Sequence, residues 1–273
     1  MSIETPALAP IDLEYPGWRR REPPDPLFGP DGEMLYPDRD GRPMAENTLQ
    51  ADWIALIKGG LDLLYRDDPD VFVAADLFWY PVEGRNTRRL APDSMVAFGR
   101  PKGQRGSYQQ FKEAGIPPQV VFEIWSPSNR KRVMDYKFKF YERYGVEEYY
   151  HFEPFKIRLD GWVRDGDAFR PIAQTNGWVS PRLGIRFEVG ETMTIYRPDG
   201  RPFRSVIETS RQLDEAERIA REAKAQARRD RRAAREATAR ADRDTQAARE
   251  ATARIERIAA RLRELGIDPD EIP

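Results

Sequence analysis

The sequence predicts an α+β fold in which a mixed β-sheet is flanked by helices and followed by a long C-terminal α-helix. Three observations support this prediction. Apolar residues recur at helical spacing over residues 46–65 and again over about 130–144. Short runs rich in aromatic and β-branched residues, separated by Gly, Pro or Asp, follow one another from Glu148 onward. Residues 207–265 contain neither Pro nor Gly and are dominated by Ala, Arg and Glu.

Residues 1–44 are rich in Pro, Gly and Asp, which break any long helix. Such a segment is either disordered or an arm that lies on the domain. We expect the arm, because its aromatic residues need burial; they are Tyr15, Trp18, Phe28 and Tyr36. The domain itself is expected over residues 45–200.

The first elements of this domain are a helix and a strand. Asn47 followed three residues later by Gln50 resembles a capping box at the start of the 46–65 helix. Residues 71–82 form a long strand candidate that Asp76 interrupts. We interpret Asp76 as a strand end or a bulge; the weaker alternative is a metal ligand. After residue 148, five strand-like runs predict a mixed sheet finished by antiparallel hairpins; they read EYYHFE, KIRLDGWVR, AFRPIA, GIRFEV and TMTIYRP.

Two apolar strand-like runs in the middle of the chain each present one carboxylate. Asp93 opens the first run, and Glu123 lies inside the second. A charged residue within a buried strand is costly unless something pairs with it. Hard divalent cations prefer carboxylate oxygens. The two acids therefore predict a cation site, with Mg²⁺ or Mn²⁺ as the expected cofactor.

Residues 207–265 predict a coiled coil. The octapeptide AAREATAR occurs at 233–240 and again at 247–254, a repeat of two heptads. With Leu213 at position a, apolar residues fill fourteen of the sixteen a and d positions. Most of them are Ala, which buries little surface. We expect a homo-oligomer through this helix; the alternative is a lone, solvated helix.

The motifs, taken together, resemble a known family. They are Pro92-Asp93, Glu123 in its apolar strand, Ser126-Pro127-Ser128, Lys137 with Tyr141, and Gly145-Val146-Glu147-Glu148-Tyr149-Tyr150. Their order and spacing are similar to the restriction endonuclease family called Uma-two, within the PD-(D/E)xK nuclease superfamily. The resemblance covers roughly residues 43–197. It implies a restriction-endonuclease-like core and a metal-dependent endonuclease that hydrolyses DNA.

One departure from the superfamily concerns its Lys, which normally stands two residues after the acid. Trp125 occupies that place here. The resemblance implies that the amine has moved onto the helix as Lys137; the alternative is an ordinary solvated Lys. An acid from the first helix often helps hold the metal in the superfamily, which makes Glu46 a weaker candidate. The other interpretation of Glu46 is an acid favoured by the helix dipole.

A basic, Gly-rich loop follows the Asp93 strand and supplies candidate nucleic-acid contacts: Arg100, Lys102 and Arg105. Backbone amides and basic side chains of this kind can contact phosphates. The alternative is a flexible surface loop. A P-loop is excluded because its Gly-Lys-Ser/Thr ending is missing. His151, the only His, is expected to be a structural strand residue, since one His cannot form a His-rich zinc site.

Composition sets further limits. The 273 residues suffice for one sizeable domain with an extension, and the net charge of −1 does not by itself indicate a polyanionic partner. The absence of Cys excludes disulfides and Cys nucleophiles and is compatible with a reducing cytoplasm, where we expect the protein. Neither a signal peptide nor an apolar run long enough for a membrane span is apparent.

Two functional hypotheses follow. In the first, Asp93 and Glu123 hold the metal of an endonuclease acting on DNA, and Lys137 positions the attacking water or neutralises charge on phosphorus. In the alternative, a catalytically degenerate nuclease fold acts as a binding or oligomerisation scaffold through its coiled coil. The displaced Lys favours this alternative. A Ser hydrolase is excluded because the sequence lacks a Gly-x-Ser-x-Gly elbow.

Overall fold

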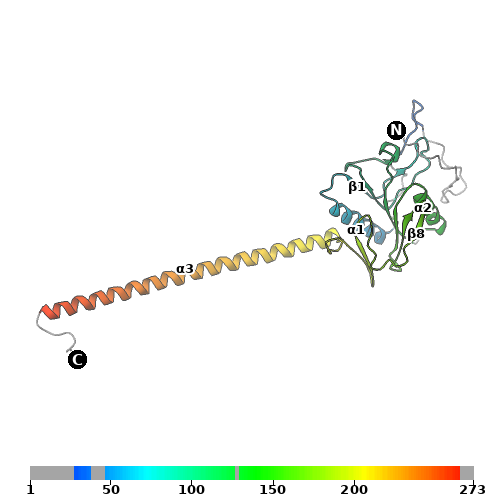
Figure 1. Ribbon diagram of the computed structural model, residues 1–273. Helices are drawn as coiled ribbons and strands as arrows, with labels where there is room; N and C mark the ends of the chain where they lie inside the picture. The colour runs from blue at the N-terminus through cyan, green and yellow to red at the C-terminus, as the bar shows by residue number, and fades with distance from the viewer. Residues whose placement is uncertain (1–27, 38–46, 127–128, 265–273) are drawn as a thin grey trace. The chain divides into compact units, whose positions relative to one another are not determined.

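The computed structural model describes residues 28–37, 47–126 and 129–264 (Figure 1). The chain divides into two compact units, Met1–Glu208 and Thr209–Pro273. The first unit contains the sheet and two helices, and the second contains most of a long helix. The α+β fold class predicted from the sequence is confirmed. The finer division into an arm, a domain and a coiled coil stays a prediction.

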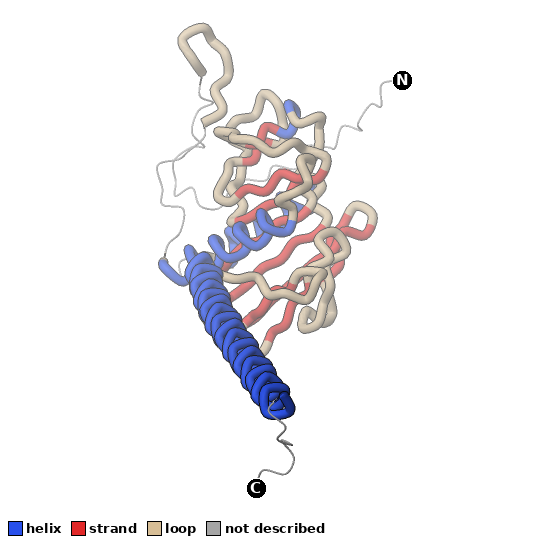
Figure 2. Tube along the Cα trace, turned by 90° about the vertical axis from the view of Figure 1, so that its left-hand side faces the viewer, coloured by secondary structure: helices blue, strands red, loops and turns tan. Residues whose placement is uncertain are grey.

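The main sheet has six strands in the order β1-β3-β5-β6-β7-β8 (Figure 2). β5 and β6 run parallel, and the other neighbours are antiparallel. A parallel pair needs a crossover connection, and α2 supplies it here. The strands are β1 (Val71–Ala74), β3 (Ser94–Phe98), β5 (Val120–Ile124), β6 (Glu148–Glu153), β7 (Arg158–Asp165) and β8 (Ala168–Pro171).

Two helices, α1 (Thr48–Leu64) and α2 (Lys131–Arg143), cover opposite faces of this sheet (Figure 1). Side chains alternate along a strand, so each strand contributes to both faces. On the first face α1 buries Ile54, Ile57 and Leu61 against Val96, Val120 and Phe122. On the second face α2 buries Tyr136, Phe140 and Tyr141 against Met95, Val121 and Tyr149. Both helices start and end within two residues of the predicted bounds.

The single long strand expected over residues 71–82 is wrong, whereas the interruption expected at Asp76 is confirmed, because the strand ends at Ala74 and the chain turns at Asp76. This residue has a φ of 47° and its N–H donates to the carbonyl of Pro92 at 3.0 Å. β2 (Trp79–Tyr80) then pairs in parallel with β4 (Tyr108–Gln109), which the short 3₁₀ helix η1 (Gln110–Lys112) follows. The five strands expected after residue 148 are all present. The last two, β9 (Arg186–Val189) and β10 (Met193–Tyr196), form a separate hairpin beside α1 rather than extending the main sheet.

The described part of the N-terminal arm, residues 28–37, contacts the domain as expected at one of its aromatic residues. The ring of Tyr36 packs edge-on against Tyr80 with centroids 5.2 Å apart. The carbonyl of Pro37 accepts a hydrogen bond from the Tyr80 hydroxyl at 2.6 Å. Phe28 is 56% exposed, contrary to the expectation of burial. Tyr15 and Trp18 lie outside the described residues.

The C-terminal helix α3 (Val206–Glu264) is continuous over 59 residues, as the absence of Gly and Pro predicted. Ser205 and Glu208 form a reciprocal capping box at its start. Ion pairs at helical spacing, such as Arg218 with Glu215 and Glu222, connect successive turns. Within residues 206–264 no side chain is buried. None of the described helices has a stretch apolar enough to cross a lipid bilayer.

Adjacent glycines on α1 give a matched test of how this helix packs. A Cβ added at Gly60 would overlap the ring of Phe203, whereas one added at Gly59 would meet nothing within 4 Å in the described part of the chain. We expect Gly60→Ala to lower the free energy of unfolding by about 1–3 kcal/mol through overpacking. Gly59→Ala should raise it by roughly 0.5–1 kcal/mol, because Ala loses less backbone entropy. Urea denaturation of both variants measures the difference, and equal shifts would contradict the packing of Phe203 on α1.

Candidate active site

The strand register places the two predicted acids on the same face of the sheet. Ser94 of β3 pairs with Phe122 of β5, so Asp93 and Glu123 come next to each other one position further on. Both follow the alternation that points Met95 toward α2. Asp93 is 8% exposed and Glu123 is 2% exposed. The structure therefore brings two buried carboxylates together beneath α2.

The position of Asp93 follows from the way β3 begins. β3 does not pair with β5 beyond Ser94, so the next N–H group of β5, that of Ile124, needs another acceptor. The Asp93 carboxylate takes this role, with Oδ2 2.6 Å from the Ile124 nitrogen. The carbonyl of Ile124 in turn accepts a hydrogen bond from the side chain of Gln50 on α1 at 3.1 Å. Side-chain hydrogen bonds thus engage both the N–H and the carbonyl of Ile124.

Two residues of α2 hold the carboxylate of Glu123, one at each oxygen. The amine of Lys137 lies 2.6 Å from Oε2, and the hydroxyl of Tyr141 donates to Oε1. Residues four apart on a helix share one face, so a single face of α2 presents both donors. The side chain of Lys137 is only 14% exposed. The structure therefore brings Lys137 to the two acids.

The electrostatics of the cluster show an excess of negative charge. Burial, followed by the charge of Glu123, raises the pKa of Asp93 to about 7, although Lys137 acts in the opposite direction. Burial and the charge of Glu123 also raise the pKa of Tyr141 well above its ordinary value, so this hydroxyl stays a donor. With both acids ionised, one amine faces two carboxylates, and the cluster carries a charge of −1.

This donor set fits a divalent cation. Asp93 and Glu123 offer hard oxygen atoms, and a bound cation would offset the repulsion between the two carboxylates, which adds to burial in raising the pKa of Asp93. Magnesium is commonly held by one or two carboxylates and keeps several of its waters. Among the described residues, no group of three or more His, Cys, Asp or Glu side chains gathers as a ready-made cage. Glu46, the weaker candidate ligand, lies outside the described residues.

His151 continues the same row across the sheet. It pairs with Glu123 in the β5–β6 register and is 8% exposed. Its Nε2 has no hydrogen-bond partner among the residues that the structure describes. Burial lowers the pKa of His151 to about 4, so the imidazole is neutral at pH 7. The sequence alone indicated only a strand residue, because its place beside Glu123 depends on the register.

Sequence reasoning missed Gln50 and Tyr141 as parts of the cluster. Gln50 is the first position of the buried stripe of α1, which continues with Ile54, Ile57 and Leu61. A polar residue four positions before Ile54 was the available signal. The backbone N–H of Gln50 donates to Oδ1 of Asn47 at 2.9 Å, which is the predicted helix cap, while its side chain donates to the carbonyl of Ile124. The signal for Tyr141 was its spacing of four from Lys137.

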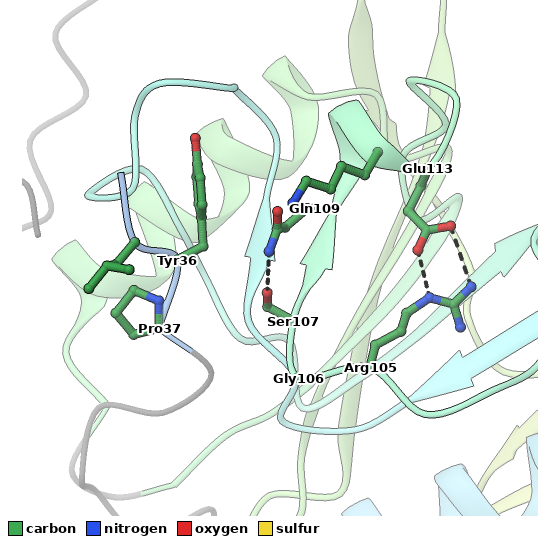
Figure 3. A pocket seen from close by; sticks show the side chains of 9 residues that line it. Tyr36, Pro37, Arg105, Gly106, Ser107, Gln109 and Glu113 are labelled. Atoms are coloured by element: carbon green, nitrogen blue, oxygen red, sulfur yellow. Dashed lines mark hydrogen bonds and ion pairs between the residues drawn. The ribbon is translucent and has the colours of Figure 1, made fainter. Parts of the chain in front are cut away.

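The basic side chains of the loop make their ion pairs and hydrogen bonds with Glu113 and with backbone carbonyls. Arg100 and Arg105 both pair with Glu113, with nitrogen–oxygen distances of 2.9 and 2.6 Å, and Lys102 donates to the carbonyl of Tyr65 at 2.5 Å. Figure 3 shows Arg105 turned toward Glu113 at the edge of a cavity of about 590 Å³. Neither acid of the cluster lines this cavity. The charges of the loop hold it together, and DNA contact through it stays a prediction.

A model of the Uma2 family, described as "Putative restriction endonuclease", matches residues 43–201. This span contains Asp93, Glu123 and Lys137. No curated protein matches the chain. A solved structure with similarity is that of a "putative nuclease belonging to DUF820" from Anabaena variabilis ATCC 29413, with 11% identity and a TM-score of 0.39. That match covers 55% of this chain and 78% of the other.

The raised pKa of Asp93 predicts a specific pH dependence of stability. An unfolded Asp titrates near 3.9, whereas in the folded protein the pKa of Asp93 is about 7. The contribution of Asp93 is therefore fully present below about pH 4 and is lost as the pH rises through 7. In metal-free buffer with EDTA, we expect wild type to lose on the order of 4 kcal/mol between pH 4 and 8 relative to Asp93→Asn.

The Asn variant keeps an acceptor for the N–H of Ile124 but cannot ionise. Chemical denaturation of both proteins across this pH range measures the difference, and the titration of His151 cancels because both proteins contain it. Adding Mg²⁺ at pH 8 should stabilise wild type and leave the variant unchanged. Parallel pH profiles for the two proteins would contradict the assigned burial of Asp93.

Proposed function

The chain belongs to the Uma2 family, and from this premise we propose that it is a metal-dependent endonuclease that hydrolyses phosphodiester bonds in DNA. One observation carries the proposal: the carboxylate of Glu123 is buried beside Asp93 and held by both Lys137 and Tyr141. A buried charge with this many partners costs free energy to assemble. A residue whose pKa is strongly perturbed by burial and a nearby charge, as that of Asp93 is, is typical of catalytic sites. The cytoplasmic location expected from the sequence stays a prediction.

Asp93 and Glu123 would hold Mg²⁺ or Mn²⁺, which when bound polarises a phosphate oxygen and lowers the pKa of its water. The two acids come from neighbouring strands of a rigid sheet, so their separation is set by the β3–β5 register. Gln50 acts as a positioning residue. It holds the carbonyl of Ile124 and donates to Asp93, which keeps that carboxylate oriented toward Glu123.

Lys137 supplies the positive charge of the reaction. Its amine is already next to Glu123, so it lies where an attacking water or a phosphate oxygen meets the acids. In that place an ammonium group stabilises the negative charge that develops on the phosphoryl oxygens. Tyr141 keeps the second oxygen of Glu123 engaged while Lys137 exchanges its partner, because its pKa stays well above neutral.

Cleavage of plasmid DNA with Mg²⁺ tests the proposal. We expect wild type to nick the plasmid, Glu123→Ala to fall to background, and Lys137→Met to lose about 10²–10³-fold in rate, as when a preorganised charge-stabilising donor is removed. Lys139, exposed two positions further along α2, provides the matched control. Lys139→Met should cleave at the wild-type rate.

A second control is Glu148→Gln, which removes a buried carboxylate on the adjacent strand β6 that hydrogen-bonds to Ser180 and Tyr150 instead. It should change the melting temperature without changing cleavage. Equal nicking by wild type and Glu123→Ala would remove the basis of the proposal. So would a wild type that is inactive with every divalent metal, and the scaffold alternative would then stand.

We also propose that α3 pairs with α3 of a second copy of the chain. The heptad repeat presents one apolar seam along the helix. Its larger members are exposed in the single chain, with Leu213 at 61%, Ile255 at 67% and Ile258 at 52%. Exposed apolar residues at a and d positions are stabilised when a second helix covers them. Ala fills most of the remaining seam, so the association is expected to be weak.

Sedimentation equilibrium of the full chain tests this pairing. We expect a monomer–dimer equilibrium that the double variant Ile255→Glu, Ile258→Glu shifts to monomer, because it places charge in the seam. The matched control adds two Glu on the outer face, at Ala253 and Ala260, and should leave the equilibrium unchanged. A wild type that stays monomeric at the highest concentration reached would contradict the proposal.

A further inference from the structure

A second cavity of about 360 Å³ lies between α2 and strands β6 and β7, beside the acid cluster. Cavities of roughly 300–1,000 Å³ are typical of sites for small organic molecules, and this one is at the lower end. The residues that matter for its chemistry are Trp125, Lys131, Phe138, Tyr149, His151 and Trp162. None of them belongs to the proposed catalytic group.

The cavity adjoins the catalytic group through strand geometry. Trp125 follows Glu123 by two positions, and residues two apart on a strand point to the same face, about 7 Å from each other. His151 is the register partner of Glu123 on the next strand. A ligand in the cavity therefore lies within one nucleotide of a phosphate held at Glu123.

Aromatic rings form much of the cavity wall. Tyr149 stacks on Trp162 with centroids 5.2 Å apart and planes at 18°. Phe138 packs edge-on against Trp162 at 5.4 Å. Trp125, half-buried, lies edge-on to His151 at 5.6 Å. Flat aromatic surfaces of this kind bind nucleobases by stacking, and they tolerate any base because every base has a π-face.

One buried polar atom in the wall lacks a partner. Nε2 of His151 makes no hydrogen bond to any residue that the structure describes, although the side chain is more than nine-tenths buried. A buried polar atom without a partner costs free energy. His151 also lines the cavity, so a turn of its ring would bring Nε2 to a polar edge of a bound base, which would supply the missing hydrogen bond.

The charged residues that line the cavity are Lys131, Lys156 and Arg158 against Asp135 and Glu153, an excess of one positive charge. Lys131 lines it and is the first residue of α2, between Arg130 and Arg132. Helix N-termini attract anions, and cations placed there oppose the helix dipole. The first turn of α2 nevertheless carries these three cations and no acid. A phosphate at this turn would satisfy both the dipole and the cations.

We propose that this cavity receives one unpaired base of the DNA strand, with its flanking phosphate at the first turn of α2. The neighbouring phosphodiester bond then lies at Asp93 and Glu123. This inference rests on the proposed nuclease function and adds how the substrate strand is held. It also gives a role to Trp125, which stands where the superfamily has its Lys.

Binding of single-stranded DNA to the full chain in EDTA, measured by fluorescence anisotropy, tests the inference without catalysis. The two probes are an oligothymidylate and an oligomer of equal length made only of abasic sugar-phosphate. We expect wild type to bind the abasic oligomer about 10-fold or more weakly, since stacking depends on the base. This comparison needs no variant, so it does not depend on whether a variant folds.

Variants then locate the effect. Trp125→Ala should reduce the preference for the oligothymidylate, whereas Phe155→Ala, which removes an exposed aromatic outside the cavity, should retain it. Lys131→Gln should lower the salt dependence of binding by about one phosphate contact, and Lys139→Gln should not. Melting temperatures of all four variants separate loss of binding from loss of folding.

The outcomes separate the two proposals. If wild type cleaves DNA but binds both oligomers equally, the base-binding inference is overturned and the nuclease stands. If wild type prefers the oligothymidylate but does not cleave DNA with any divalent metal, the nuclease proposal is overturned and the base-binding cavity stands. If neither oligomer binds, both are overturned. A preference that Trp125→Ala and Phe155→Ala lose equally would overturn the placement of the base in this cavity.

Discussion

The pairing of Glu123 with Lys137 is the interaction on which the site depends. A carboxylate in the central strand of a sheet cannot stay ionised without partners, and Glu123 finds two on one face of α2. These contacts orient α2 relative to β5 in addition to the apolar contacts of Phe140 and Tyr136. The same helix also connects β5 to β6, so the ion pair joins the crossover to the first strand of the parallel pair.

Asp93, the second acid, leaves the cluster with an excess of negative charge, because the one amine of Lys137 cannot neutralise two carboxylates. Burial and the charge of Glu123 together raise the pKa of Asp93 to about 7. Near neutral pH the folded protein therefore holds two buried carboxyl groups whose ionised forms repel each other. Proteins commonly give up stability at sites where function needs an unfavourable arrangement. The cluster fits this description, because a divalent cation would relieve the repulsion that the fold itself imposes.

Sequence patterns located the helices, most strands and the two acids, because these depend on periodicity and on charges within apolar runs. Lys137 was a candidate through the family resemblance. They did not locate what depends on tertiary register. The position of His151 beside Glu123 follows from the β5–β6 pairing, and the hydrogen bond from Gln50 to Ile124 spans 74 positions of sequence. The single strand over 71–82 failed for a local reason. The sequence marked Asp76 as an interruption, but the apolar pattern did not reveal its left-handed conformation, which turns the chain.

The layer arrangement accounts for the way Lys137 reaches Glu123 from α2. The face of β5 that carries Glu123 also carries Trp125 and lies beneath α2. An amine can therefore reach Glu123 from within the strand or from the helix above, and a Lys stem is long and flexible enough for the second route. If Lys137 supplies the positive charge from α2, as proposed, position 125 has no need of a basic residue. A half-buried Trp can then occupy it and form the wall of the adjoining cavity. Under the proposed function, this arrangement would assign charge stabilisation to the helix and contact with the substrate to the residue that follows β5.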